Sequence, residues 1–465
     1  MESFDRFQSP FTWRYGSDKM REIWSEHNKR KLWRRIWIAL AKAESSYGLV
    51  TPSQIAELES HADDIDLEKA GKIEDSIHHD LMAELQVFAS QCPSAGGVLH
   101  LGATSMDIED NAEVMRIRES LSLLQRKLTK LLLKLAEKIE LYASLPVMAF
   151  THLQPAEPTT MGYRYACYSQ DLVDVYKRLS YTIADIRGKG FKGAVGTSAS
   201  YVELLGLDKL DDFERALSES LGLQFFDVAT QTYTRVQEYR IIALLAEMGA
   251  IFHKMAFDFR ILQMPMLGEI REPFGEHQIG SSAMPFKRNP IECEKVDSLA
   301  RLLLSYSNVA WDNAALSILE RTLDDSANRR IVLPEAFLAA DELITTMQHI
   351  IDGQIIDKEA IQLTLDTYAP FSATERVLMA LGKRGADRQI SHGRLRDMAM
   401  LAWKAVKEGK TNPLKSLIKS DEFFASFLSS DTIEKLFDVD IYIGAAEQNA
   451  LVVAERIRRL AVDEC

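Results

Sequence analysis

Long stretches of this sequence repeat apolar residues every three or four positions, which is the spacing of one face of an α-helix. The clearest stretch runs from about Ile108 to Ser144, and Pro146 ends it. A helix rises roughly 1.5 Å per residue, so this element is much longer than a small domain needs. Its apolar positions are Ile117, Leu121, Leu124, Leu128, Leu131, Leu135, Ile139 and Tyr142.

Four further stretches carry comparable patterns, and few stretches alternate in the manner of a strand. Five long helices with apolar stripes predict a helical bundle, and stripes too wide for one neighbouring helix predict packing between subunits. We therefore expect an all-α fold. The four further stretches are residues 159–186, 234–262, 291–319 and 327–351.

Shorter helices are expected in the first hundred residues. One candidate spans 29–47, and another spans 73–89 and carries His78, His79 and Asp80. Adjacent positions on a helix point in different directions, so at most one of the two histidines should face a site.

With 465 residues, the chain is too long for one ordinary core. A turn follows Asp357, and several glycines punctuate the sequence after it. We expect three helical domains: an N-terminal domain, a central domain of long helices, and a smaller C-terminal domain. Their expected bounds are residues 1–107, 108–355 and 356–465.

The amino-acid composition excludes some classes of function and indicates a cellular compartment. A net charge of −13 argues against general nucleic-acid binding, so an anionic ligand must meet a local basic pocket. The sequence begins without an export pattern, and no apolar run approaches membrane length. The four cysteines have neither metal-ligand nor C-x-x-C spacing, which predicts a cytoplasmic protein without structural zinc. They are Cys92, Cys167, Cys293 and Cys465.

The segment from Gly188 to Gly193 satisfies the G-x-G-x-x-G pattern of dinucleotide-binding proteins. That function requires a strand before the pattern and a helix directly after it. Here a long helix precedes the pattern, and residues 194–200 are too small and polar to begin another. We interpret the segment as a loop.

Residues 276–290 form a polar loop that carries Ser281, Ser282, Lys287 and Asn289. Upstream prolines and glycines end the preceding helix, and Pro290 can begin the next one. A loop of this length with its own polar chemistry is usually a lid or a site. The alternative is a solvated connection with a chance basic pair.

The string Gly280-Ser-Ser-Ala-Met-Pro-Phe-Lys-Arg-Asn-Pro290 resembles the signature of the fumarase/aspartase superfamily. Members of that superfamily eliminate fumarate from a succinyl group attached through oxygen or nitrogen. The resemblance implies that Ser281 is the general base and that Lys287 holds a substrate carboxylate. Ser282 stays an alternative base, because the residues alone do not separate the two serines. The resemblance further implies roles for Asn289 in binding and for Glu294 as the acid associated with the loop.

Two further motifs resemble those of the superfamily. The resemblance of Thr151-His-Leu-Gln-Pro-Ala156 implies that His152 is the general acid; otherwise this histidine is a cap partner at a helix boundary. Thr104 and Ser105 end the motif His100-Leu-Gly-Ala-Thr-Ser105. Their hydroxyls either bind a carboxylate or cap the following helix, and the two roles are compatible.

The segment Arg321–Arg330 distinguishes best between the different enzymes of the superfamily. Its Arg321, Ser326 and Arg330 can grip a phosphate through charge-assisted hydrogen bonds, although a solvated charged turn is the alternative. The segment resembles the phosphate-binding segment of the adenylosuccinate lyase family, in particular its longer, animal-type group. That resemblance implies substrate contacts by Arg14, Tyr15, Asp80 and Gln231. It also implies that His79 contacts the substrate and supports catalysis.

The chain departs from that family at two positions. His78 and Lys295 stand where many members have arginine, so neither is assigned a substrate contact. The family resemblance implies cleavage of adenylosuccinate to AMP and fumarate, and of SAICAR to AICAR and fumarate, in purine biosynthesis. It implies no metal and no organic cofactor. It also implies a homotetramer in which each site takes its motifs from three subunits.

Two other hypotheses stay open at the level of sequence. Another superfamily enzyme, such as argininosuccinate lyase or a carboxymuconate cycloisomerase, would not need Arg321, Ser326 and Arg330 to hold a phosphate. A non-catalytic helical scaffold would be expected to have lost Ser281, Lys287 or His152.

Overall fold

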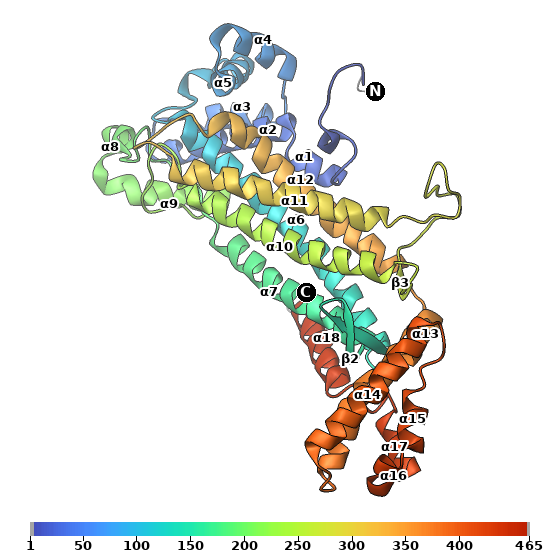
Figure 1. Ribbon diagram of the computed structural model, residues 1–465. Helices are drawn as coiled ribbons and strands as arrows, with labels where there is room; N and C mark the ends of the chain where they lie inside the picture. Colours follow the sequence, from blue (N-terminus) through green and yellow to red (C-terminus); the bar gives the residue numbers. More distant parts are fainter. Residues whose placement is uncertain (1–3, 463–465) are drawn as a thin grey trace. The chain divides into compact units, whose positions relative to one another are not determined.

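The computed structural model describes residues 4–462, and Cys465 lies outside this range. All five predicted long helices are present, and they run alongside one another in Figure 1. The prediction of an all-α fold is confirmed, apart from two small two-stranded sheets. The long helices are α6 (Ser105–Leu141), α7 (Met161–Asp185), α10 (Val236–Leu262), α11 (Ile291–Ala315) and α12 (Ser326–Gly353).

Shorter elements surround the long helices along the chain. The N-terminal part contains η1 (Pro10–Thr12), α1 (Asp18–Ile23), α2 (Glu26–Ser45), α3 (Pro52–Ser60), α4 (Leu67–Ile77), α5 (Asp80–Gln91) and η2 (Gly96–Val98). The middle part contains β1 (Pro146–Thr151), β2 (Gln154–Thr160), α8 (Ala199–Leu205), η3 (Leu207–Lys209), α9 (Leu210–Leu221) and β3 (Ile270–Arg271). The C-terminal part contains β4 (Ile355–Ile356), α13 (Lys358–Gly382), α14 (Arg388–Lys407), α15 (Leu414–Ser420), α16 (Glu422–Phe427), α17 (Ser430–Leu436) and α18 (Ala446–Val462).

The chain folds into two compact units, each assembled from separated segments. Every long helix contributes one part to each unit, because the boundaries fall inside these helices. The expected division into three consecutive domains stays a prediction. Unit 1 comprises residues 1–128, 175–250 and 298–345, and unit 2 comprises residues 129–174, 251–297 and 346–465.

In unit 1 the five long helices form a closed ring of neighbours. The predicted stripe of α6 is fully buried from Ile117 to Leu128. A methyl group added at Gly249 of α10 would lie 3.5 Å from Leu303 of α11, so these two helices are in close contact. Hydrogen bonds join the other neighbours: Gln125 to Ser180, Arg178 to Glu247, Tyr306 to Glu335, and Lys127 to Thr345.

A buried network of charged side chains joins α6, α10 and α12 in the same unit. Arg329 donates to both carboxylate oxygens of Glu238, at 2.9 Å from Nε and 2.5 Å from Nη2. Arg235 donates to Asp325 at 2.9 Å and lies 3.0 Å from Asp110. Two arginines face three carboxylates here and balance most of their charge, whereas removing one partner would leave a buried charge unpaired.

The loop with the G-x-G-x-x-G pattern lies against α6, as its interpretation as a loop requires. Lys189 forms a buried ion pair with Asp107, whose carboxylate also accepts from Gly193 N at 3.2 Å. Asn111 donates to the carbonyl of Gly190 at 3.1 Å and accepts from its N–H at 3.1 Å. The glycines therefore serve a close backbone approach to a helix. The expectation that residues 194–200 begin no helix is wrong at their end, because α8 begins at Ala199, although no helix directly follows Gly193.

One expected helix is wrong. The sequence predicts a continuous helix over 73–89, but α4 ends at Ile77 and α5 begins at Asp80. His78 takes a left-handed conformation with φ of 56°, and His79 is the N-cap of α5. Its side chain accepts from Met82 N at 3.5 Å, so the polar side chain replaces a helical hydrogen bond.

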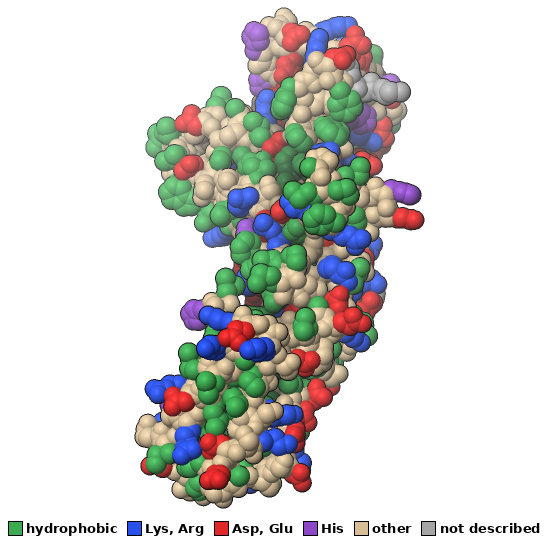
Figure 2. Space-filling view, turned by 45° about the vertical axis from the view of Figure 1, so that its right-hand side comes forward, with side chains coloured by type: hydrophobic (Ala, Val, Ile, Leu, Met, Phe, Trp, Pro, Cys, Tyr) green, Lys and Arg blue, Asp and Glu red, His purple; other side chains and the backbone are tan. Residues whose placement is uncertain are grey.

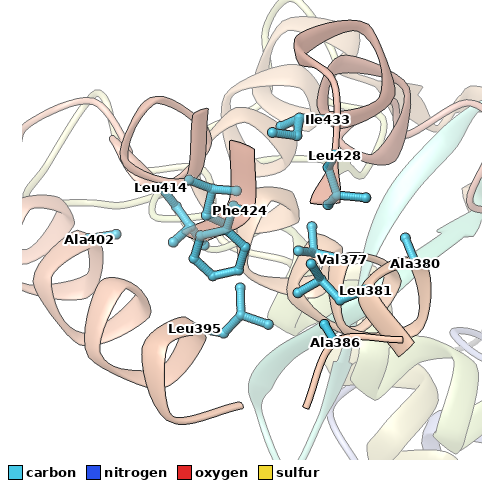
Figure 3. Close-up of a cluster of buried hydrophobic side chains, with 11 residues drawn as sticks. Val377, Ala380, Leu381, Ala386, Leu395, Ala402, Leu414, Phe424, Leu428 and Ile433 are labelled. Carbon is cyan, nitrogen blue, oxygen red and sulfur yellow. The ribbon is translucent and has the colours of Figure 1, made fainter. Parts of the chain in front are cut away.

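In unit 2, the antiparallel hairpin β1–β2 lies beside α13 and α18. Tyr442 donates to Glu157 of the hairpin at 3.1 Å, and Arg458 of α18 donates to Glu140 of α6 at 2.6 Å. Helices α13 to α17 enclose a separate apolar core around Phe424, which Figure 3 shows between Leu414, Leu381 and Leu395. Among the helices described, none is long and apolar enough to cross a membrane.

The buried network predicts an acid-sensitive fold. Burial alone would raise the pKa of Glu238, but Arg329 and Arg235 lower it to about 2, from an ordinary value of 4.5. A carboxyl whose pKa is lower in the folded state stabilises the fold above its unfolded-state pKa. Its contribution is therefore present above about pH 4.5 and is lost as the pH falls towards about 2. Urea unfolding measured across this window should show the loss.

In the variant Arg329→Met, the buried pair is broken, which should lower the free energy of unfolding at pH 7 by about 3–5 kcal/mol. The remaining decrease between pH 4.5 and 2 should be smaller than in the wild type. As a control, Arg396→Met removes an exposed ion pair with Asp397 and should change stability by less than about 1 kcal/mol. An Arg329→Met protein as stable as this control would contradict the prediction.

Candidate active site

Unit 1 contains a small polar cavity of about 110 Å³ between α2, α5, α6 and α12. Four residues predicted to bind substrate line it together, although they are far apart in the sequence. These residues are Asp80, Arg321, Ser326 and Arg330. Lys29 and Glu109, for which no sequence motif predicts a role, also line the cavity.

The buried network positions the basic side of this cavity. Arg321 donates to Asp325 at 2.9 Å, and the same carboxylate accepts from the buried Arg235 at 2.9 Å. Ser326 directly follows Asp325 and is the first residue of α12. Arg330 lies one turn further and remains largely exposed, with 64% of its side chain accessible. Of the two arginines predicted to hold a phosphate, Arg321 is therefore fixed and Arg330 is accessible.

Asp80 faces this arginine from the start of α5. Its carboxylate lies 3.3 Å from Nη2 of Arg330 and 3.9 Å from Nζ of Lys29. The lysine also lies 5.0 Å from the centre of the Trp33 ring, a geometry that favours a cation over an aromatic face. Asp80 thus orients two cations, and an anion that binds either cation must compete with it.

His79 and Ser105 lie together at the edge of the same unit. The Nδ1 atom of His79 accepts from Met82 N, so in the neutral ring the proton belongs on Nε2. That Nε2 atom lies 3.4 Å from Oγ of Ser105, the first residue of α6. The cap at α5 therefore fixes the direction in which His79 presents its N–H group.

Thr104 and His100 have structural contacts in the preceding turn. The Thr104 backbone N–H donates to the Asp107 carboxylate at 2.9 Å, whereas capping of α6 by the hydroxyls of Thr104 and Ser105 stays a prediction. His100 accepts at Nδ1 from the indole N–H of Trp37 at 3.0 Å, and burial lowers the pKa of this histidine. An indole N–H can only donate, so this contact favours a neutral His100.

Arg14, Tyr15 and Gln231 also belong to unit 1, but none of them lines the described cavity. Arg14 is exposed and lies beside the Tyr15 ring, with 5.9 Å between the guanidinium carbon and the ring centre. The backbone N–H of Gln231 donates to the carbonyl of Glu320 at 3.2 Å, next to Arg321. Their predicted substrate contacts stay predictions.

In unit 2, Glu272 holds together the two ends of the loop that carries the serines. Its Oε1 accepts from Cys293 N at 2.6 Å and its Oε2 accepts from Glu292 N at 3.2 Å. These are N–H groups of the first turn of α11, where a carboxylate also meets the favourable end of the helix dipole. On the other side, Gln263 accepts from Glu272 N at 2.9 Å and donates to Arg288 O at 3.3 Å.

The loop itself is held in a compact turn. Ser281 Oγ accepts from Met284 N at 3.1 Å, and the side chain of Asn289 donates to the carbonyl of Gly280 at 2.8 Å. A Cβ atom at Gly280 would lie 2.1 Å from the Lys287 carbonyl oxygen, so only glycine fits there. Asn289 therefore has a structural contact in addition to its predicted contact with substrate.

Lys287 and Asn289 line a larger cavity of about 990 Å³ in unit 2, together with Arg260 and Glu272. The Lys287 side chain is exposed, as a residue that meets a substrate anion must be. Glu294 lies 3.6 Å from Arg260, and Lys295 pairs with Glu292 at 2.8 Å. Glu294 and Lys295 lie near the start of α11, just after the loop.

His152 lies at the tip of the β1–β2 hairpin rather than in a simple break between helices. Thr151 pairs with Gln154, so His152 and Leu153 alone form the turn, with φ of 54° and 58°. Such turns favour asparagine and glycine, and each non-glycine residue held in this region costs about 1–3 kcal/mol. Leu153 is 73% exposed at the same tip. Among the described residues, no hydrogen bond or ion pair joins His152 to Ser281 or Lys287.

Three residues of the site were not identified from the sequence: Lys29, Glu109 and Glu272. Lys29 and Glu109 lie in helical patterns with many other charged residues, so no spacing distinguishes them. For Glu272 a signal exists, because it directly precedes Pro273 at the start of the polar loop. A buried acid at that place can only be recognised once the returning helix is known.

Two family models match the chain. The model described as Lyase covers residues 13–303, which is more than half of the chain. A second model, described as Adenylosuccinate lyase C-terminus, covers residues 370–450. The first match includes Ser281, Lys287 and His152, and the second lies entirely in unit 2.

Solved structures of similar fold are 24% identical in sequence, so they bear on the fold alone. A 3-carboxy-cis,cis-muconate lactonizing enzyme from Pseudomonas putida superposes with a TM-score of 0.87, over 97% of this chain and 99% of the other. A fumarate lyase from Mesorhizobium has a TM-score of 0.83 with the same coverage.

Whole-sequence relatives are more specific. An adenylosuccinate lyase from Saccharomyces cerevisiae is 38% identical over 456 residues, which are 96% of this chain and 94% of the yeast protein. An adenylosuccinate lyase from Schistosoma mansoni is 39% identical over 459 residues, covering 97% and 95% of the two chains. Identity at this level over nearly the whole length, together with the two matching family models, shows that the chain belongs to the adenylosuccinate lyase family.

Proposed function

We propose that the protein cleaves adenylosuccinate to AMP and fumarate as an enzyme of purine biosynthesis. Membership of the family supports this activity. The observation that favours it within the wider superfamily is the cavity of unit 1, where Arg321, Ser326 and Arg330 converge. Lyases without a phosphate on their substrate do not need that convergence. SAICAR carries the same succinyl and phosphate groups, and we include it as a second substrate.

The reaction is a β-elimination that needs three kinds of group. A base removes a proton from the succinyl carbon next to a carboxylate, and the electrons of that C–H bond form the new C=C bond. The C–N bond breaks, and an acid protonates the leaving nitrogen. Fixed positive charge stabilises the carboxylate-derived intermediate, whose negative charge increases during proton removal.

In this proposal Ser281 is the general base and His152 is the general acid. A serine is a poor base at neutral pH, so it needs positive charge and hydrogen-bond donors close to it when the site is complete. Lys287 supplies a cation for the substrate carboxylate. Glu294 is the supporting acid at the start of α11, where Arg260 already pairs with it at 3.6 Å.

The other proposed residues bind the rest of the substrate. His79 presents its Nε2–H group towards Ser105, and Thr104 and Ser105 offer hydroxyls for a carboxylate. We propose further substrate contacts for Arg14, Tyr15, Asp80, Gln231 and Asn289. The phosphate is held by Arg321, Ser326 and Arg330.

We also propose a cytoplasmic homotetramer with sites built from several subunits. The long helices support this, because large apolar side chains remain exposed on α11 and α12. They include Leu304, Trp311 and Ile331, each more than half exposed. Figure 2 shows such apolar side chains in several places on one face of the molecule. Exposed apolar patches of this kind commonly mark protein–protein contacts.

Replacing the base tests the proposed mechanism. Ser281→Ala should lower kcat for adenylosuccinate by at least about 10²–10⁴, because no group removes the proton, while substrate binding stays largely intact. The measurement is the change in purine absorbance as AMP forms, with binding measured separately. Ser282→Ala is the matched control and should keep most of its activity. A nearly normal Ser281→Ala enzyme together with an inactive Ser282→Ala enzyme would assign the base to Ser282.

The phosphate contact can be tested with a variant and a modified substrate. Arg330→Ala should raise KM for adenylosuccinate by about tenfold or more, because a charge-assisted hydrogen bond contributes about 1.5–3 kcal/mol. Succinyl-adenosine, which lacks the phosphate, should be a poor substrate for the wild type. Arg459→Ala removes an exposed arginine of α18 and should leave KM unchanged. Equal efficiency of the wild type on both substrates would contradict the phosphate assignment.

A further inference from the structure

Glu109 is a carboxyl group in the cavity of unit 1 for which the proposed function gives no role. It projects from α6, one residue before Asp110 of the buried network, and it lines the same cavity as Ser326 and Arg330. It forms no hydrogen bond or ion pair with any described residue. An unpaired acid beside a proposed phosphate site is unexpected, because two negative groups repel each other at short distance.

Charged groups face Glu109 from every helix around the cavity. Lys29 and Glu26 belong to α2, Asp80 begins α5, Arg329 and Arg330 lie in the first turns of α12, and Arg321 lies in the segment before α12. On its own helix, Asp110 and Glu113 also line the cavity. Burial raises the pKa of Glu109 to about 7, with Asp80 and Asp110 acting in the same direction and Lys29 and Arg330 opposing them.

The basic side chains of the cavity are already paired with carboxylates. Arg330 lies 3.3 Å from Asp80, and Lys29 lies 2.7 Å from Glu26. The same holds for Arg116, Arg321 and Arg329, whose partners are Glu113, Asp325 and Glu238. A phosphate dianion therefore enters a cavity in which positive and negative groups roughly balance, unless one of the acids becomes neutral.

Among the carboxyl groups that line the cavity, Glu109 requires the least free energy to take up a proton. Asp80 faces two cations, whereas Glu109 has no close partner that holds it in the ionised form. A protonated carboxyl group is a hydrogen-bond donor, so the same change that removes a repulsive charge creates a favourable contact.

We propose that Glu109 takes up a proton from solvent when the phosphate of the substrate binds, and that its O–H group then donates to a phosphate oxygen. This proposal rests on the phosphate assignment made above. It makes Glu109 a residue that determines specificity, since it couples recognition of the phosphate to pH. No covalent bond other than the O–H bond of the carboxyl group forms.

The proposal predicts a pH dependence of binding that is confined to ligands with a phosphate. When binding takes up one proton, affinity falls by about tenfold for each pH unit above the pKa of the free group. The second pKa of a phosphate monoester is about 6, so its own charge hardly changes above pH 7.5. Between pH 8 and 9, AMP should therefore bind several-fold to about tenfold more weakly, while adenosine binding should not change.

The experiment is calorimetric titration of the full-length protein with AMP and with adenosine, from pH 7.5 to 9. Titrations in two buffers with different ionisation enthalpies give the number of protons taken up. The wild type should take up close to one proton with AMP at pH 8 and none with adenosine. Glu109→Gln keeps the shape and the donor but cannot titrate, so its AMP affinity should stay constant. Glu119→Gln removes an acid of the same helix that does not line the cavity and lies 3.8 Å from Lys19, so it should keep the wild-type pH dependence.

The possible results separate the two hypotheses. If AMP binds no more tightly than adenosine at pH 7.5, the phosphate assignment fails, and the role of Glu109 fails with it. If AMP binds more tightly but the wild type takes up no proton, only the role of Glu109 is overturned. The same holds if Glu109→Gln retains the pH dependence. Because proton uptake is measured on the wild type, the test does not depend on how well the variant folds.

Discussion

The contact between Arg329 and Glu238 is the constraint on which the proposed phosphate site depends most. Glu238 is buried and only 12% of the Arg329 side chain is accessible, so removing either partner would leave a poorly solvated charge without its closest partner. With Arg235 and Asp325, they fix the first turn of α12 and the segment before it. Neighbouring arginines of α12 therefore have different roles. Arg329 pairs with Glu238 in the network, whereas the side chain of Arg330 stays accessible.

Unit 2 positions its proposed catalytic groups by local constraints of a different kind. The His152 turn holds two non-glycine residues in a left-handed conformation, and the hairpin around it is supported by Tyr442 at Glu157. The Ser281 loop is closed at its base by Glu272 and crossed by the contact between Gly280 and Lys287. Strain of this kind persists only where the surrounding structure fixes it, and it is common at functional sites.

The long helices could be predicted from the sequence, because each carries apolar residues at helical spacing. The stripe from Ile117 to Ile139 is buried, because apolar residues at every third or fourth position form one face of a helix, and that face is stable only when it packs against other helices. The sequence did not predict the break at His78 and His79, because a capping histidine looks like any other polar helix residue. The β1–β2 hairpin was missed as well, because its turn lacks the usual asparagine and glycine.

Some residues of the candidate site could likewise be predicted from the sequence, and others could not. Ser281, Lys287 and Arg330 were found because they stand in recognisable motifs. Glu109 and Lys29 could not be found, because only the packing of α2, α5, α6 and α12 brings these charged residues to one cavity. Their role is set by the neighbours they meet in space, which no spacing along the chain encodes.

We proposed that each site is built from several subunits. If His152 and Ser281 of one site come from different subunits, as the family resemblance implies, hybrid oligomers test this proposal most directly. His152→Ala and Ser281→Ala proteins are mixed, unfolded mildly and refolded together, and fumarate release is compared with that of each variant refolded alone. Some sites of the hybrids then receive both intact residues, so a substantial fraction of activity should return. If mass spectrometry shows that hybrids formed and no activity returns, each site is built within one chain and the proposal is contradicted.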